Sequence, residues 1–219
     1  MSEHAEALAS FQRTLAADPD NRAALYNAGM AAYLAGQPSL SVTYWGRLKA
    51  LEPGDWRVRA KLVQAHEALG QRGERDAERA QLLQMRAAGQ NEELKQAKHY
   101  CRDQFAVGQA RVMAFEFFDL EGETPVRYGF DLLDEAGQRV VARYTVGSYS
   151  ATNALALETG QIQPGQRLFH LDGYKPGGLH ETYGFMVGEP DYDQAKAAVT
   201  QVLQGTWRPT SGSRPTPGS

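Results

Sequence analysis

The chain has 219 residues, 42% of them hydrophobic and 22% charged, as in an ordinary globular protein long enough for two modest domains. The net charge of −3 and a pI near 6.0 exclude a concentrated basic surface, so nucleic acid is not expected as the main partner. No window approaches the roughly 18 apolar residues of a membrane helix, and the start lacks the pattern of a secretion signal. With a single cysteine, these features predict a cytoplasmic protein that does not insert into membranes.

Residues 1–90 carry a repeat. Pro19 and Pro53 lie 34 residues apart, and each follows a stretch with helical periodicity. Between them, Gly29 and its small neighbours would let a second helix approach closely, and Gly36 can take the left-handed conformation that ends a helix. Trp45 is expected to fill the wedge between the two helices.

The run from Ala23 to Gly36 resembles the first helix of a tetratricopeptide repeat. The resemblance rests on the Tyr-Asn-x-Gly order that begins at Tyr26 and on the later Tyr33. A third unit is less faithful, with a turn over residues 71–76 and a helix over 77–88. The resemblance implies about two and a half repeats within residues 1–88, packed as a solenoid of α-hairpins.

The first repeat begins at its second helix. Its apolar flank, formed by Leu8, Phe11 and Leu15, is therefore predicted to need a cover, supplied by a second copy of the chain, a partner or the following domain. Residues 91–106 are predicted to form a connector helix. The spacing that indicates it is Leu94, Ala97, Cys101 and Phe105, which makes Cys101 a core thiol.

From residue 107 the hydrophobic pattern changes to a period of two, which indicates half-buried antiparallel strands. The predicted strands are 110–118, 126–132, 140–146, 152–158, 167–172 and 179–187, separated by glycine- and proline-rich turns. A helix over 192–203 closes the domain at residue 205, and residues 206–219 are predicted to be a loose tail. The predicted fold is α+β: a helical solenoid, then an antiparallel meander forming a curled sheet or small sandwich, then a C-terminal helix.

The tetratricopeptide resemblance implies a groove that binds a protein or peptide. The implied groove residues are Tyr26, Asn27, Met30, Tyr33, Leu34, Arg57, Lys61, Gln64 and Glu67. Some members of the family clamp a partner's terminal carboxylate with an asparagine and two basic residues. Asn27, Arg57 and Lys61 stand at matching positions, although solvated surface charges are the alternative interpretation.

A second candidate lies on the predicted hairpin of strands 167–172 and 179–187. Pairing across its turn would place Tyr174 opposite His180 and Asp172 opposite Thr182, with His170 on the same face. Such a face could bind a metal or perform acid–base chemistry. The alternative is a solvated face whose opposite side buries Phe169, Leu171 and Phe185.

Together these patterns predict a non-enzymatic interaction protein with no cofactor. The helical repeats would dock another protein or peptide, and the β domain would supply a second binding surface or an accessory module. The alternative is an enzyme, or a ligand- or metal-binding protein, with its site on the face of His170, Asp172 and His180 and with the repeats as a targeting arm. The glycine-rich stretches lack the strand–loop–helix context of a phosphate-binding loop.

Overall fold

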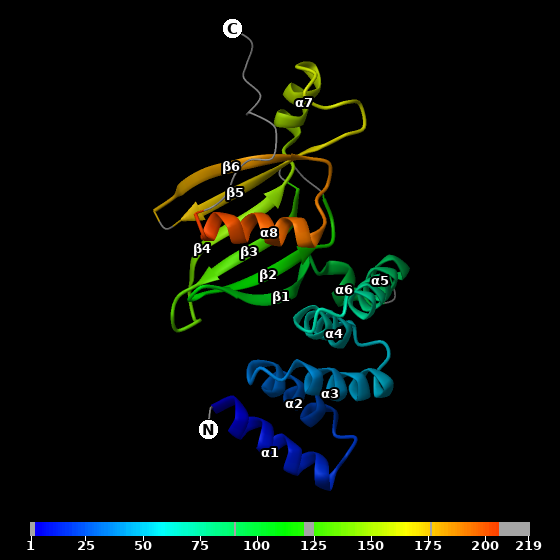
Figure 1. Cartoon of the computed structure of the whole chain (residues 1–219). Coiled ribbons are helices and arrows are strands. Elements are labelled where there is room, and N and C mark those ends of the chain that lie inside the picture. Colours follow the sequence, from blue (N-terminus) through cyan, green and yellow to red (C-terminus); the bar gives the residue numbers. More distant parts are fainter. Residues whose placement is uncertain (1–2, 90, 121–124, 176, 206–219) are drawn as a thin grey trace. The chain divides into compact units, whose positions relative to one another are not determined.

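The computed structural model describes residues 3–89, 91–120, 125–175 and 177–205. The chain divides into two compact units, Met1–Asp103 and Gln104–Ser219. Helices and an antiparallel sheet occur together, which confirms the α+β class (Figure 1). The tail predicted over residues 206–219 lies outside the described residues.

Helices α1 to α6 belong to the first unit, and each of α1 to α4 packs against the next helix along the chain. Their bounds are α1 Glu3–Ala17, α2 Arg22–Leu34, α3 Pro38–Leu51, α4 Trp56–Ala68, α5 Arg72–Ala88 and α6 Glu92–Gln96. Helices α2 and α4 begin 34 residues apart, and so do α3 and α5. The period in the sequence is therefore a period of helices, while the tetratricopeptide assignment stays a prediction.

Local signals set the helix ends in this unit. The side chains of Asn21 and Asp55 accept backbone N–H groups at the starts of α2 and α4. The chain leaves the same two helices through Gly36 and Gly70, whose φ angles of 74° and 66° favour glycine. The turn predicted over residues 71–76 is wrong, because α5 already begins at Arg72 and continues through one glycine in its first turn.

Helices α2 and α3 pack tightly at Gly29 of α2. A Cβ atom there would lie 2.2 Å from Nε1 of Trp45, so only glycine leaves room for the indole. Trp45 is fully buried, and its Nε1 donates a hydrogen bond to the backbone oxygen of Tyr26 at 3.1 Å. The predicted wedge between α2 and α3 is confirmed.

The apolar flank predicted for α1 is not exposed. Leu8 and Leu15 are buried in the core that α1 shares with α2 and α3, and Phe11 packs against that core. The expectation of an uncovered flank is wrong because α2 already covers the apolar side of α1. The exposed positions of α1 are mostly polar, as at Glu6 and Arg13.

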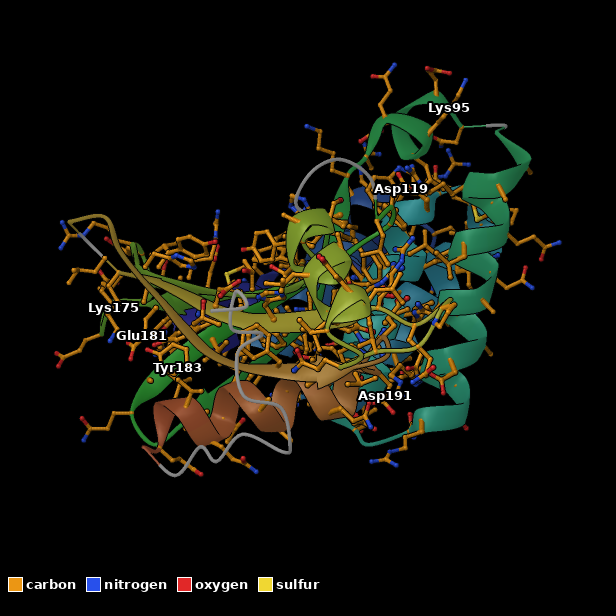
Figure 2. The ribbon with its side chains drawn as sticks, turned by 90° about the horizontal axis from the view of Figure 1, so that it is seen from above. Lys95, Asp119, Lys175, Glu181, Tyr183 and Asp191 are labelled. Carbon is orange, nitrogen blue, oxygen red and sulfur yellow. The ribbon has the colours of Figure 1, made fainter. Side chains whose placement is uncertain are left out.

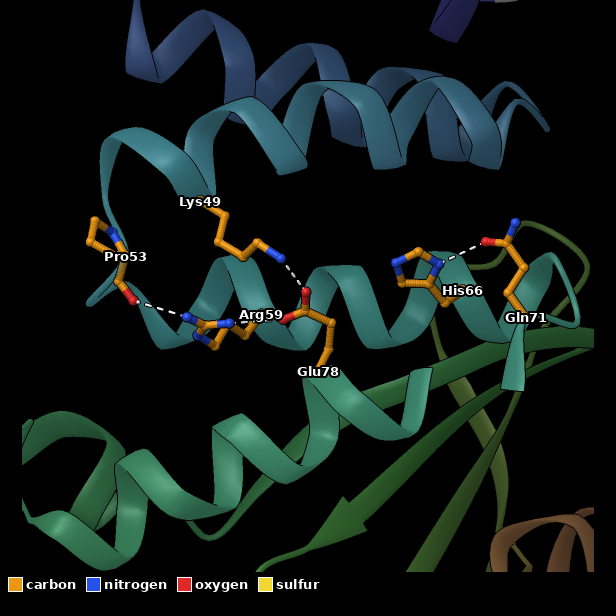
Figure 3. Close-up of polar contacts among 6 residues, drawn as sticks. All are labelled: Lys49, Pro53, Arg59, His66, Gln71 and Glu78. Atoms are coloured by element: carbon orange, nitrogen blue, oxygen red, sulfur yellow. Dashed lines mark hydrogen bonds and ion pairs between the residues drawn. The ribbon is translucent and has the colours of Figure 1, made fainter. Parts of the chain in front are cut away.

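A polar network joins α3, α4 and α5 (Figure 3). The Glu78 carboxylate of α5 pairs with Lys49 of α3 and accepts a hydrogen bond from Nη1 of Arg59 in α4 at 2.9 Å. At the other end of α4, Nδ1 of His66 lies 2.7 Å from Oε1 of Gln71. These largely buried contacts fix the last helices relative to one another.

Within the described residues, the sheet has six strands in the order β1-β2-β3-β4-β5-β6. Their bounds are β1 His99–Val107, β2 Ala110–Phe117, β3 Val126–Leu133, β4 Val140–Gly147, β5 Leu168–Lys175 and β6 Leu179–Val187. The registers from β2 to β6 are antiparallel between sequence neighbours, so the predicted meander is confirmed as a single curled sheet.

One face of this sheet packs against α8, Tyr192–Leu203 (Figure 1). Their shared core includes Phe130, Val146 and Leu171 from the strands and Ala195 and Val199 from the helix. A capping box at Asp191 starts α8, as its place before the predicted helix suggested. We refer to the side that meets α8 as the helix-covered face, and to the other side as the outer face.

Two segments form a different secondary structure from the one predicted for them. The connector helix over 91–106 stops at Gln96, and residues 99–107 form strand β1. The Arg86 guanidinium donates to the carbonyls of Leu94, Lys95 and Ala97, which satisfies the end of α6 before the chain turns extended. The four apolar positions at helical spacing were coincidental, and pairing in the sheet decided the conformation.

The strand predicted over 152–158 is instead helix α7, Ser150–Glu158. Its alternating alanines and leucines are strong helix formers, and intrinsic propensity prevailed over the apparent period of two. Asn153 ties the start of α7 to the sheet: its Nδ2 donates to the backbone oxygen of Tyr149 at 2.8 Å, and its Oδ1 accepts from the backbone N–H of Leu168 at 2.6 Å.

Candidate functional site

The groove side of α4 is in contact with a later part of the same unit. Arg57 pairs with Glu93 of α6, and Nε2 of Gln64 lies 3.5 Å from the sulfur of Cys101 at the start of β1. One turn further along α4, Glu67 pairs with Arg102 at 3.9 Å. The chain therefore runs along this side of α4 and occupies the position that the resemblance implied for a partner.

Three of the predicted partner-binding residues, all on α4, already have partners within the chain. Gln64 is only 1% exposed, so its assignment to a binding surface is wrong; residues of β1 cover it. Lys61 donates to Oε1 of Gln64 at 3.3 Å, and burial lowers the pKa of its ammonium group. Arg57 remains exposed but already has a carboxylate partner, so the chain itself supplies the acidic group that the implied clamp would capture.

The corresponding side of α2 is different. Asn27 is exposed, and Leu34 is 45% exposed although it is a large apolar side chain. Tyr26, Met30 and Tyr33 are half-buried and pack on the core of the unit with part of each side chain accessible. Burial raises the pKa of the Tyr26 phenol, and the nearby Asp55 carboxylate adds to the effect, so this tyrosine stays neutral.

On the sheet, the predicted cross-strand pairs are confirmed. Tyr174 lies opposite His180, and Asp172 lies opposite Thr182. The rings of Tyr174 and His180 stack, with centroids 4.7 Å apart and planes 14° from parallel. Asp172 is 1% exposed, so the prediction of a solvated face is wrong at this position.

The buried Asp172 carboxylate is held by polar groups from two segments, strand β6 and the residue that precedes α7. Its Oδ1 accepts from the hydroxyl of Thr182 at 2.7 Å and lies 3.4 Å from Nε2 of His180. Its Oδ2 accepts from the hydroxyl of Tyr149 at 2.8 Å, and that hydroxyl lies 3.2 Å from the hydroxyl of Tyr174. Tyr149 directly precedes α7, so the unpredicted helix places the residue that closes the network.

A β-bulge in β6 changes which face each later residue occupies. The register shifts between Leu171 and Asp172, so Tyr183 is an extra residue in β6. Beyond it, Phe185 lies opposite His170, and their rings meet edge to face with centroids 4.6 Å apart. The prediction that Phe185 shares the face of Phe169 is therefore wrong, because strict alternation does not hold across a bulge.

Hydrogen bonds and burial within this cluster keep the Tyr149 phenol protonated. Burial, together with hydrogen bonds to Tyr174 and Asp172, raises the pKa of the Tyr149 phenol, which therefore remains a donor at neutral pH. Among the described residues, no three His, Cys, Asp or Glu side chains come together as a metal ion would require. The arrangement instead fixes the ring of Tyr174, which is 39% exposed, at the surface of the outer face.

The outer face also contains a hollow that the sequence did not indicate. It has a volume of about 700 Å³, opens to solvent and is lined by Val126, Val140, Val141, Ala142, Arg143, Thr145 and Tyr174. Arg143 lies directly opposite Tyr174 in the register of β4 and β5. The alternation along β4 could have placed Arg143 and Thr145 on the face of Asp172, but nothing in the sequence aligned β4 with β5.

The tip of the same hairpin bears charged side chains, Lys175 and Glu181, which Figure 2 shows from above together with Tyr183. Lys175 and Glu181 pair at 3.7 Å, and both are exposed. Exposed pairs of this kind contribute little to stability.

No protein-family model matches this chain, and the search of curated proteins gives no match either. In the part of the chain that the structure describes, no helix is long and apolar enough to cross a membrane.

Proposed function

We propose that this protein binds an extended segment of another protein through the groove side of α2, and that its role is binding, not catalysis. The observation that supports this most is the contact between α4 and the chain's own residues 93–102. After the short helix α6, the extended residues Cys101 and Arg102 lie against one helix of the repeated pair. By the 34-residue period, the same side of α2 carries partly accessible aromatic and apolar side chains.

The chemistry of α2 suggests the kind of segment that binds there. By the period, Asn27 takes the place of Lys61, and Met30 the place of Gln64, so this side of α2 has no ionised group among Tyr26, Asn27, Met30, Tyr33 and Leu34. Methionine and tyrosine adapt to apolar side chains, while an asparagine amide can hydrogen-bond a backbone. We therefore assign an uncharged, apolar extended segment as the partner, in place of the carboxylate that the clamp would require.

The test is a selection of peptides on the full-length chain, followed by affinity measurement for one selected sequence by fluorescence anisotropy. Leu34→Asp and Asn27→Asp place a charge on the groove side of α2 without removing a buried contact. Each should weaken binding about tenfold or more: Leu34→Asp removes an apolar contact, Asn27→Asp removes an amide donor, and both introduce a charge that must be desolvated.

The matched control is Leu51→Asp, which introduces the same charge at an exposed leucine at the end of α3. Its affinity should equal that of the wild type, and so should that of His180→Ala in the sheet unit. Equal loss in the α2 variants and in Leu51→Asp, or no loss in the α2 variants, contradicts the proposal.

A further inference from the structure

The hollow on the outer face of the sheet has the composition of a small-molecule site. Ligand sites are mostly apolar with a few fixed polar groups, and their volumes fall between roughly 300 and 1,000 Å³. Here the apolar part comes from Val126, Val140 and Val141, and the polar part from Arg143 and Thr145, whereas the side chain of Ala142 belongs to the core beneath α8. The hollow is shallow and open, so a molecule could bury much of its surface only by lying flat on the strands.

Arg143 is held in place before any ligand arrives. Its Nε and Nη2 donate to the two carboxylate oxygens of Asp131 at 2.5 and 2.7 Å. Asp131 is buried, whereas the Arg143 side chain is 57% exposed. Asp131 compensates most of the positive charge, but the two hydrogen bonds leave further N–H donors of the planar guanidinium facing solvent.

Tyr174 is held equally firmly on the next strand. One side of its ring stacks on His180, and its hydroxyl lies 3.2 Å from that of Tyr149. The buried Asp172 anchors both neighbours, through Tyr149 and His180. Because Tyr174 lies opposite Arg143, a flat aromatic surface and a planar donor group stand side by side along the hollow.

We infer that the hollow binds a small planar aromatic molecule that carries a hydrogen-bond acceptor, a carboxylate or carboxamide. The aromatic ring lies on the valines beside Tyr174, and the acceptor takes the outward N–H groups of Arg143. A flat ring buries the most surface on an open sheet, and a fixed guanidinium selects an oxygen acceptor in its own plane. The assignment is independent of the helical unit.

The experiment is titration of the ¹⁵N-labelled full-length chain with 2-naphthoate, followed by amide chemical shifts. Saturable shifts are expected at Val141 to Thr145 and at Tyr174. Two further probes test the chemistry: 2-naphthamide should bind at the same residues, and cyclohexanecarboxylate, which is not planar, should bind about tenfold more weakly.

Tyr174→Leu should weaken 2-naphthoate about fivefold through loss of the aromatic contact. Arg143→Gln should weaken it about tenfold, because the charged acceptor loses its donors, and should weaken the amide less. Glu181→Gln, on the opposite face of β6, is the matched control and should leave both affinities unchanged.

Thermal unfolding of each variant shows whether Arg143→Gln leaves the sheet folded, and Arg143→Lys retains a positive charge near Asp131 as a second variant. Shifts outside the hollow, equal binding of all three probes, or affinities unaffected by both Tyr174→Leu and Arg143→Lys overturn the inference.

Discussion

The groove side of α2 and the outer face of the sheet differ in how their polar residues are used. In the helical unit, polar residues of the predicted groove contact another part of the same chain, since Gln64 and Glu67 both contact β1. The uncharged side of α2 remains accessible. In the sheet unit, the polar residues lie beneath the surface and support it, since Asp172 is buried under Tyr174 and His180. In both units, buried polar groups hold neighbouring side chains in place, and exposed aromatic or apolar side chains remain accessible to a ligand or partner.

The largest loss of stability is expected at Gly29 in the helical unit, where the packing of two helices requires a residue without a side chain. Gly29→Ala would place a Cβ 2.2 Å from Trp45, an overlap that the buried indole cannot relieve without moving α3. We expect a loss of about 3 kcal/mol in the free energy of unfolding, measured by urea denaturation. Gly46→Ala in α3, where a Cβ has no neighbour within 4 Å, should be neutral or slightly stabilising. Equal effects would show that Gly29 is not a packing requirement.

The sheet unit has a comparable glycine with more tolerant neighbours. A Cβ at Gly173 would lie 2.8 Å from the ring of Tyr183 and 3.0 Å from the ring of Tyr144. Tyr144 is buried, but the Tyr183 ring is half-buried and can shift, so Gly173→Ala should cost about 1–2 kcal/mol, less than Gly29→Ala. Chemical denaturation monitored by tyrosine fluorescence measures it, and a larger loss than at Gly29 would reverse the ranking.

The network beneath Tyr174 should make the sheet unit sensitive to alkaline pH. Because the folded-state pKa of Tyr149 is raised, its contribution to stability is fully present below its unfolded value of 10.0 and is lost as pH rises above it. Burial and a hydrogen bond to Glu181 also raise the pKa of Tyr183, to about 12, with the same sign. Tyr149→Phe should cost about 1 kcal/mol at pH 7 and flatten the decline of stability above pH 10.

Thermal unfolding between pH 7 and 11 checks this prediction, with absorbance at 295 nm reporting tyrosine ionisation. A stability profile of Tyr149→Phe that stays parallel to that of the wild type above pH 10 would show that Tyr149 does not carry the effect.

The smallest effect is expected at the ion pair between α4 and α6. Both side chains, Arg57 and Glu93, are 52% exposed, so solvent screens their attraction. Arg57→Gln should change stability by less than about 0.5 kcal/mol. Arg86→Gln, which removes the donor to the carbonyls of Leu94, Lys95 and Ala97, should cost more, about 1–2 kcal/mol. Thermal unfolding of the two variants measures both losses. A larger loss for Arg57→Gln than for Arg86→Gln would contradict the expected ranking.

Much of the fold could be predicted because local chemistry and the global fold agree. The period of 34, the glycines at 29 and 36 and the proline-ended helices placed α2 and α3, and strict alternation placed β2, β3, β4 and β6. The errors occurred where two patterns competed. At residues 97–105 the apolar groups follow helical spacing without alternation, and pairing with the neighbouring strand β2 decides the conformation. Residues 152–158 alternate in a sequence whose residues favour helix.

The candidate sites were less predictable because they depend on contacts distant in sequence. The pairs of Tyr174 with His180 and Asp172 with Thr182 followed from one hairpin turn, and both are present. The burial of Asp172 depends on Tyr149, more than twenty residues earlier and attached to a helix predicted as a strand. In the same way, the cover on Gln64 depends on Cys101, which was assigned to a helix.

The bulge at Tyr183 affects how β6 could pair with another chain, as well as which residues lie on each face of the sheet. Strand β6 ends the order of the described sheet, so one side of its backbone has no neighbouring strand in that order. A regular strand in this position would be a template for pairing with another chain, a route to fibres or unintended dimers. The extra residue interrupts the even spacing of N–H and C=O groups halfway along β6, and the exposed side chain of Glu181 lies before the bulge. The residue that turns Phe185 toward His170 therefore also makes β6 a poorer template for a further strand.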